Sequence, residues 1–192
     1  VVPNAWDEPH PLPPTDGPVV SFVALLSWAP NGQAATWFTE QVWPRVVDRL
    51  PEARLQHVGR NPTPAVQALA GPTVTVTGSV ADLEPWYART RVSVAPLLAG
   101  GGSRLKILES LAAGRPVVAT TVGAEGLEDL IGRGVVVADE PAGMAEALIG
   151  LLTDRAAAEE LGRRGAAAVA ADHTWTAAVR PLLAQLGGGT EG

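Results

Sequence analysis

Short apolar runs alternate with stretches of helical spacing along most of this chain. Six such runs, mostly valine and alanine between turn residues, have the length and composition of buried β-strands. They occupy residues 19–26, 54–59, 74–77, 91–95, 116–120 and 134–138. Their spacing predicts an alternating order of strand and helix.

Helical spacing is clearest in residues 34–50, where apolar side chains recur at intervals of three and four residues. A turn at residues 27–32 is predicted to precede this helix. Asp82 is placed to cap a later helix, and Gly114 is a stop signal for another. The other predicted helices are residues 64–69, 82–88, 104–113, 142–152, 156–171 and 176–186.

This order favours one Rossmann-like α/β domain, a parallel sheet of about six strands with helices on both faces. We assign the domain to residues 18–186. The proline-rich residues 1–17 are predicted to be an interdomain hinge or linker and not a packed element, and residues 187–192 a flexible tail. Ligands of such folds bind at the carboxyl ends of the strands.

Composition excludes several classes of function. The formal net charge of −6 argues against nonspecific binding of nucleic acid. The chain has no cysteine, which rules out disulfides and thiolate metal sites. The apolar runs are too short to cross a bilayer and no signal peptide is evident, so we expect a cytoplasmic protein without a transmembrane segment.

One stretch departs from the acidic average. Residues 85–108 contain four cations and neither aspartate nor glutamate. A small basic spot on an acidic protein suits one small anion better than a polyanion. The four cations are Arg89, Arg91, Arg104 and Lys106.

Two common nucleotide motifs are missing. No Gly-x-Gly-x-x-Gly follows the first predicted strand, and the chain has no Gly-x-x-x-x-Gly-Lys-Ser/Thr. The histidines His10, His57 and His173 are too dispersed to suggest a metal cluster. His57, inside a strand, is expected to be an ordinary packed or half-exposed residue. We therefore predict neither a metal site nor a bound cofactor.

A glycine-rich loop after the fourth predicted strand carries the strongest candidate chemistry. Gly100, Gly101 and Gly102 would let the backbone come close to a ligand, and Ser103 is placed to cap a helix that begins near Arg104. The amide groups at that helix start favour an anion.

Charged side chains on the same helix extend this hypothesis. Arg104 and Lys106 can donate charge-assisted hydrogen bonds to phosphate, and Glu109, about one turn further on, can accept hydrogen bonds from ribose hydroxyls. The competing interpretation makes the glycines a flexible loop and pairs both cations with Glu109 on a solvated helix face.

The segment from Val92 through Gly100-Gly-Gly-Ser-Arg-Leu-Lys-Ile-Leu-Glu109 to Thr120 resembles the donor-binding signature of family 4 glycosyltransferases, which have the GT-B fold. Supporting segments follow in the family's order, so the resemblance extends from residue 1 to residue 186. They are residues 1–4, which resemble the hinge, and residues 22–31, 37–44, 55–60, 76–82 and 122–127.

The resemblance implies roles for individual residues. Glu109 matches the ribose-binding glutamate, whereas Gly101 stands where a glutamate usually contacts the donor sugar. Residues 27–36 lack the cations that many members place after the first strand, and Ala24 replaces a usual glycine. The implied nucleotide and diphosphate residues are Gly101, Gly102, Ser103, Arg104, Leu105, Lys106 and Glu109. The implied nucleobase loops contain Gly59, Arg60, Gly78, Ser79 and Val80.

Two further side chains have alternative interpretations. Glu125 is a candidate contact to the sugar, with helix capping as the alternative. Trp28 is expected to pack in the core or at a domain interface rather than to stack on a ligand.

The resemblance implies the donor-binding half of a retaining glycosyltransferase of the hexosyltransferase type. This half would bind an NDP-sugar without a metal, while an N-terminal domain, expected outside this chain, holds the acceptor and makes any membrane contact. The chain alone is expected to be inactive, and none of its residues is assigned as catalytic. A nucleotide-sugar epimerase of similar fold and a noncatalytic nucleotide-binding or interaction module remain alternatives.

Overall fold

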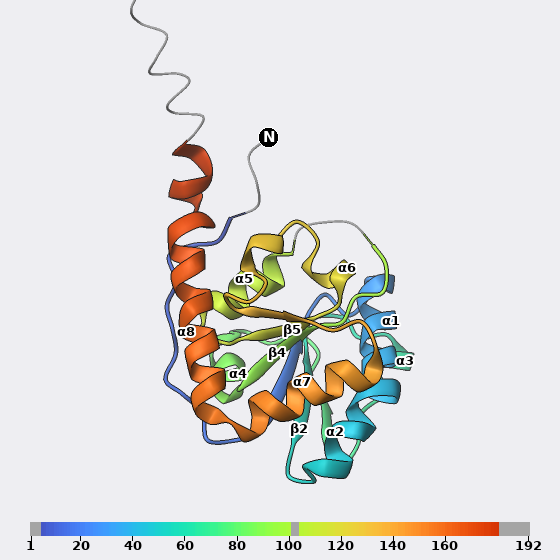
Figure 1. Ribbon diagram of the computed structural model, residues 1–192. Helices are drawn as coiled ribbons and strands as arrows, with labels where there is room; N and C mark the ends of the chain where they lie inside the picture. The colour runs from blue at the N-terminus through green and yellow to red at the C-terminus, as the bar shows by residue number, and fades with distance from the viewer. Residues whose placement is uncertain (1–4, 101–103, 181–192) are drawn as a thin grey trace, which may run out of the picture.

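The computed structural model describes residues 5–100 and 104–180. Its centre is an open six-stranded sheet in the order β3-β2-β1-β4-β5-β6, in which every neighbouring pair is parallel (Figure 1). The predicted Rossmann-like α/β class is confirmed. The strands are β1 (Val19–Val23), β2 (Arg54–Val58), β3 (Val74–Val76), β4 (Val92–Ala95), β5 (Val117–Ala119) and β6 (Val135–Val137).

Helices cover both faces of the sheet. On one face α7 packs against α2, β4 and β5, and on the other α5 packs against α8, β4 and β5. The helices are α1 (Ala29–Trp37), the π-helical turn η1 (Phe38–Val42), α2 (Trp43–Arg49), α3 (Pro64–Gln67), α4 (Glu84–Arg89), α5 (Leu105–Ala112), α6 (Thr121–Ala124), the 3₁₀ turn η2 (Glu128–Leu130), α7 (Pro141–Thr153) and α8 (Arg155–Asp172).

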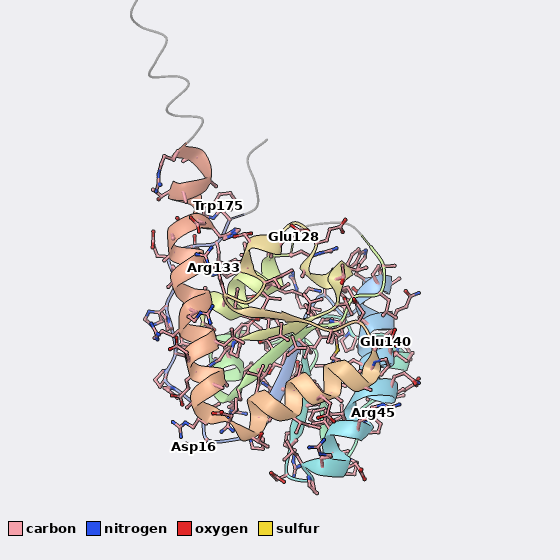
Figure 2. The ribbon with its side chains drawn as sticks, in the orientation of Figure 1. Asp16, Arg45, Glu128, Arg133, Glu140 and Trp175 are labelled. Carbon is pink, nitrogen blue, oxygen red and sulfur yellow. The ribbon has the colours of Figure 1, made fainter. Side chains whose placement is uncertain are left out.

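Two hydrophobic cores lie on opposite sides of the sheet, because successive side chains of a strand point to opposite faces. Val94 and Val118 lie in the core with α1, α2 and α7. Their neighbours Ala95 and Val117 lie in the core with α5 and α8. Charged side chains such as Arg45 and Glu140 lie on the outside of these layers (Figure 2).

The first helical region begins earlier than predicted. The sequence pattern indicated a helix over residues 34–50, but α1, η1 and α2 run without interruption over residues 29–49. The expected turn at residues 27–32 is therefore partly helical. Pro30 lies in the first turn of α1, where its missing N–H costs no hydrogen bond, so the proline starts the helix instead of preceding it.

Of the signals at two other helices, the one at Gly114 acts as expected and the one at Asp82 does not. The N-cap of α4 is Leu83, because the helix begins two residues later than predicted, and Asp82 instead accepts a hydrogen bond from the amide of Glu84 at 2.9 Å from the position before the cap. Gly114 follows α5 with a φ of 74°, a conformation that glycine adopts at little cost, and its amide donates to the carbonyl of Leu111 at 2.9 Å. Residues 175–180 are helical, and the rest of the helix predicted at 176–186 lies outside the described residues.

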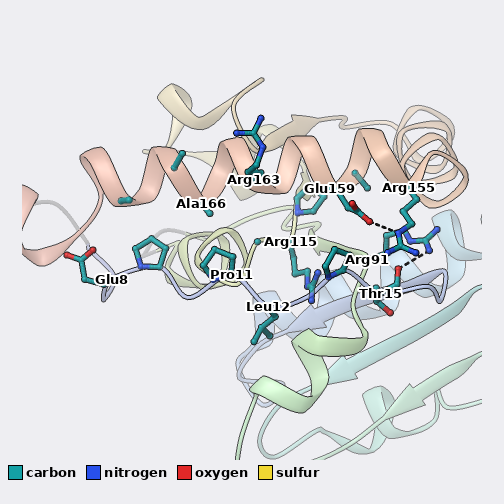
Figure 3. Close-up of a pocket in the computed structure, with 17 residues that line it drawn as sticks. Glu8, Pro11, Leu12, Thr15, Arg91, Arg115, Arg155, Glu159, Arg163 and Ala166 are labelled. Carbon is teal, nitrogen blue, oxygen red and sulfur yellow. Dashed lines mark hydrogen bonds and ion pairs between the residues drawn. The ribbon is translucent and has the colours of Figure 1, made fainter.

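The N-terminal segment was expected not to be packed, and the structure corrects this. Residues 8–15 lie along α8 and enclose with it a cavity of 510 Å³ (Figure 3). Arg91 donates to the carbonyls of Thr15 and Asp16, and Arg115 donates to the carbonyl of Pro13 at 2.7 Å. The prolines prevent regular secondary structure, but their carbonyls remain free to accept hydrogen bonds from buried guanidinium groups.

The two ends of the described chain are joined by main-chain hydrogen bonds. The amide of Trp6 donates to the carbonyl of His173 at 2.8 Å, and the amide of Trp175 donates to the carbonyl of Trp6 at 3.2 Å. These bonds, which we call the terminal clasp, hold residues 5–7 against the end of α8 (Figure 1). Trp175 itself is 53% exposed at that end of the molecule (Figure 2).

Candidate functional site

A cavity of 650 Å³ lies at the carboxyl ends of β1 and β2, where ligands of this fold class bind. Six of the residues that the resemblance implies for nucleotide binding line this cavity: Gly59, Arg60, Val80, Leu105, Lys106 and Glu109. Gly78, Ser79, Arg104 and Glu125 are not among its described lining residues, and Gly101, Gly102 and Ser103 lie outside the described residues. The other described lining residues are Trp6, Val23, Ala24, Leu25, Ala81 and Leu83.

Two loops are joined closely at the rim of this cavity. The amide of Ala24 donates to the carbonyl of Val58 at 2.9 Å, and the amide of Leu26 donates to the carbonyl of Arg60 at 3.1 Å. Gly59 lies between these bonds with a φ of 155°, and a β-carbon there would lie 1.7 Å from the Ala24 carbonyl oxygen. Only glycine fits at this position, so the rim has a fixed shape.

Lys106 is the only lysine of the chain and lies largely buried beside the cavity. Its Nζ donates to Oδ1 of Asn31 at 2.6 Å and lies 5.0 Å from the centre of the Phe22 ring. Burial, with a smaller contribution from the positive charge of Arg104, lowers the pKa of Lys106 to about 8. At pH 7 the ammonium group is therefore charged but poorly solvated, which favours an anionic ligand.

Asn31 is a site residue that the sequence analysis missed. Its side chain is 4% exposed, and its Nδ2 donates to the carbonyl of Leu25 at 2.9 Å, which leaves Oδ1 directed at Lys106. The Pro-Asn-Gly sequence suggested a turn, in which an asparagine side chain usually bonds to its own backbone. Its place in the first turn of α1 instead links that helix to the lysine of α5.

Arg104 is buried, contrary to the solvated-face interpretation. Its Nη2 donates to the carbonyls of Gly100 and Val122 at 2.9 and 2.8 Å and lies 3.1 Å from Oε2 of Glu125. The side chain of Arg104 is 4% exposed, whereas that of Glu125 is 69% exposed. Arg104 therefore connects the end of the loop at Gly100 to α6, and Glu125 pairs with this arginine.

The N-cap of α6 is provided by another residue. The side chain of Thr120 accepts a hydrogen bond from the amide of Gly123 at 2.9 Å. Glu125 follows the last residue of α6, so the helix-capping alternative for this glutamate is wrong as an N-cap.

Glu109 lies one helical turn beyond Lys106 and lines the same cavity. Burial raises the pKa of the Glu109 carboxyl, and a hydrogen bond with the Tyr87 hydroxyl partly opposes this shift. The carboxylate is therefore placed on a desolvated wall of the cavity, where hydroxyl groups of a ligand would replace lost hydration.

The expected single basic spot is divided by β4. Arg104 and Lys106 lie beyond its carboxyl end, whereas Arg91 lies at its start and donates to the carbonyl of Leu152 as well as to the N-terminal segment. Arg89 lies over the ring of Trp86, 5.5 Å from its centre. The length of β4 therefore keeps Arg89 and Arg91 away from the cavity, although they are near Lys106 in sequence. The cationic side chains among the described lining residues are those of Lys106 and Arg60.

The predictions for His57 and Trp28 have different outcomes. His57 is fully buried, as expected for a packed residue, and hydrogen-bonds with Thr39 at 2.8 Å. Burial lowers its pKa to about 4, so it is neutral at pH 7. Trp28 is 40% exposed and therefore is not a core residue of this domain.

The cavity beside α8 also contains arginines, but they are used internally. Arg155 pairs with Glu159 (Figure 3) and with Asp16, and Arg163 pairs with Glu160. Over residues 5–100 and 104–180, no group of three or more histidine, aspartate or glutamate side chains could hold a metal ion. No helix in the same part of the chain is long and apolar enough to cross a membrane.

Comparison with known proteins identifies the family. Residues 17–154 match the family described as "Glycosyl transferases group 1". The chain belongs to this family. It is also 27% identical over 139 residues to an uncharacterized 44.6 kDa protein in the cps region of Klebsiella pneumoniae. The aligned region covers 68% of this chain and 36% of that protein.

Solved glycosyltransferase structures have the same fold. The chain matches sucrose-phosphate synthase from Thermosynechococcus elongatus with a TM-score of 0.74 and 23% identity, over 98% of this chain and 53% of that one. The match to Anabaena HepE in complex with UDP and glucose has a TM-score of 0.66 and 17% identity, over 90% and 48% of the two chains.

A third match is a single domain. The C-terminal domain of the group 1 glycosyl transferase LpcC from Francisella tularensis has a TM-score of 0.64 and 18% identity, over 84% of this chain and 89% of that one. The chain thus spans 53% and 48% of the sucrose-phosphate synthase and HepE chains, but nearly all of this isolated domain. These likenesses establish a GT-B half-domain fold.

Proposed function

We propose that this chain is the donor-binding half of a retaining, hexosyltransferase-type family 4 glycosyltransferase. It binds an NDP-sugar, and a glycosyl group passes to an acceptor on an N-terminal domain. One observation carries the proposal: the only lysine, Lys106, and the half-buried Glu109 line one cavity at the carboxyl edge of the sheet. The UDP complex of HepE supports a nucleotide ligand for a site of this fold.

The cavity suggests a division of the nucleotide among its walls. Lys106 and the amide groups at the start of α5 attract the diphosphate, and Glu109, one turn along, accepts hydrogen bonds from the ribose. The rim at Gly59 and Arg60 and the loop at Val80 are placed to contact the base. Arg104 holds the carbonyl of Gly100 at the base of the glycine-rich loop, and its direct contact with the diphosphate stays a prediction.

Transfer requires that the departing diphosphate be stabilised as it gains negative charge. A preorganised positive charge in a poorly solvated site stabilises the departing diphosphate without having to reorganise during the reaction. Lys106, held by Asn31, is such a group. We therefore propose transfer without a metal ion, from a protein of the cytoplasm whose acceptor domain and any membrane contact belong to the rest of the enzyme.

Glu109→Gln is expected to weaken binding of the preferred nucleotide by about tenfold, because a neutral amide replaces a charge-assisted acceptor. The measurement is calorimetry with UDP, GDP and ADP. Glu146→Gln, an exposed glutamate on α7, removes the same charge away from the cavity and should leave the dissociation constant unchanged. Equal binding by the two variants would contradict the role of Glu109.

The same titrations test the proposed function as a whole. Binding of one of the three diphosphates supports a donor site, and no heat of binding at millimolar nucleotide would favour a noncatalytic interaction module. The 192-residue chain assayed alone is expected to show little or no glycosyl transfer, because in the proposed enzyme the acceptor is held by an N-terminal domain that this assay does not contain. Appreciable transfer by the chain alone would refute the two-domain assignment.

A further inference from the structure

Trp6 separates two cavities on the nucleotide-binding edge. It lines the 650 Å³ cavity together with Lys106 and Glu109. It also lines a neighbouring cavity of 240 Å³ formed with the N-terminal segment and α4. Among the described lining residues, Trp6, Leu83 and Glu109 line both cavities, so these three residues form the partition between them.

Trp6 is the only aromatic residue among the described lining residues of the larger cavity. A nucleoside has a flat base next to its ribose, and stacking of a base on an aromatic ring contributes about 1–3 kcal/mol. The neighbouring Glu109 is the residue proposed to bind the ribose. A base attached to that ribose lies within reach of the indole ring on the same partition.

The position of the Trp6 indole ring is fixed by contacts with residues near both ends of the described chain. The terminal clasp fixes the main chain of Trp6 to His173 and Trp175, and the preceding Ala5 is 1% exposed. The side chain of Trp6 also packs against the hydrophobic core beneath α5 and α8. An aromatic surface held in this way loses little conformational entropy when a ligand binds.

We propose that Trp6 is a binding and positioning residue for the nucleoside of the donor, and that the N-terminal segment is therefore part of the nucleotide site. This inference rests on the proposed function. It gives the segment a role in addition to the proposed connection to an N-terminal domain. Because Trp6 belongs to the terminal clasp, bound nucleotide also stabilises the contact between residues 5–7 and 173–175.

The test uses UDP, GDP and ADP with the 192-residue chain and its Trp6→Ala and Trp6→Phe variants. Calorimetry should show at least about tenfold weaker binding of the preferred nucleotide by Trp6→Ala, and a change within about threefold for Trp6→Phe, which keeps a stacking ring. Nucleotide should quench the tryptophan fluorescence of the wild type. The quenching should disappear in Trp6→Phe although binding persists.

Trp175→Phe is the matched control. Its side chain lines neither cavity, and the substitution leaves the main-chain bonds of the clasp in place. This variant should keep both the affinity and the quenching. Hydrogen exchange at the amides of Trp6 and Trp175 should slow when nucleotide is added, which reports on the clasp independently.

The outcomes separate this inference from the proposed function. Nucleotide that binds the wild type and still quenches Trp6→Phe as strongly would overturn the role of Trp6 and leave the donor site intact. Failure of the wild type to bind any of the three nucleotides would overturn the proposed function and this inference with it. If Trp6→Ala does not fold, the fluorescence of Trp6→Phe decides the question.

Discussion

Replacing Lys106 with methionine is expected to weaken binding of the preferred nucleoside diphosphate by about 10- to 150-fold at pH 7, the equivalent of about 1.5–3 kcal/mol for a hydrogen bond to a charged group. Methionine keeps an apolar stem beside Phe22 and removes only the ammonium group that Asn31 holds. Calorimetry measures the change. Arg45→Met, which removes one positive charge from an exposed position on α2, should have no effect.

The affinity should also depend on pH in a defined window. The pKa of Lys106 is about 8 in the free protein, and a bound diphosphate favours the charged form. Binding above pH 8 must therefore take up a proton, and the dissociation constant should rise by up to about tenfold per pH unit. Lys106→Met should lose this dependence.

A single lysine makes this titration directly observable. In protein labelled with [ε-¹³C]lysine, one side-chain signal reports the pKa of Lys106, and nucleotide should move that pKa upward. A dissociation constant that stays constant between pH 7 and 9.5, or a variant that binds as the wild type does, would contradict the assignment of Lys106 to the diphosphate.

Gly162→Ala in α8 is expected to lower the free energy of unfolding by about 2 kcal/mol, although alanine is the better helix former. A β-carbon at Gly162 would lie 2.1 Å from the carbonyl oxygen of Gly114 and 3.1 Å from Pro116. Helix α8 would have to move away from the end of α5, against which it packs. Denaturant unfolding, followed by circular dichroism, gives the free energy.

Gly150→Ala is the matched control for this substitution. Gly150 lies inside α7 and is exposed, and a β-carbon there would meet no atom within 4 Å. The same chemical change should therefore stabilise the protein by about 0.5–1 kcal/mol. If both substitutions changed the free energy of unfolding in the same direction, the close contact between Gly162 and Gly114 would not be what determines the position of α8.

The sheet was predictable because its strands are short apolar runs between turn residues, and all six runs form strands. The boundaries were less predictable where a proline has two structural uses. Pro30 could belong to a turn or to the first turn of a helix. It begins helix α1 because the next helical turn buries Ala34 and Ala35 in the core. Packing of the N-terminal segment depends on Arg91 and Arg115, which are far from it in sequence.

The candidate site was predictable where one helix carries it. Lys106 and Glu109 are three residues apart, so a helix places them on one face, and both line the cavity. Asn31 and Trp6 were missed because their roles arise from contacts across 75 and more than 100 residues of chain. The direct phosphate role implied for Arg104 remains a prediction, since its Nη2 contacts carbonyl oxygens and Glu125.

The burial of Lys106 beside the cavity has a chemical consequence. It is the chain's only side-chain amine, and near pH 8 a substantial fraction is neutral and nucleophilic. Acylating and reductively alkylating reagents therefore have one side-chain target, on the lining of the proposed donor site. Amine coupling to a solid support through Lys106 would block that site, whereas a cysteine introduced on the outer surface would give a unique thiol and leave the site open.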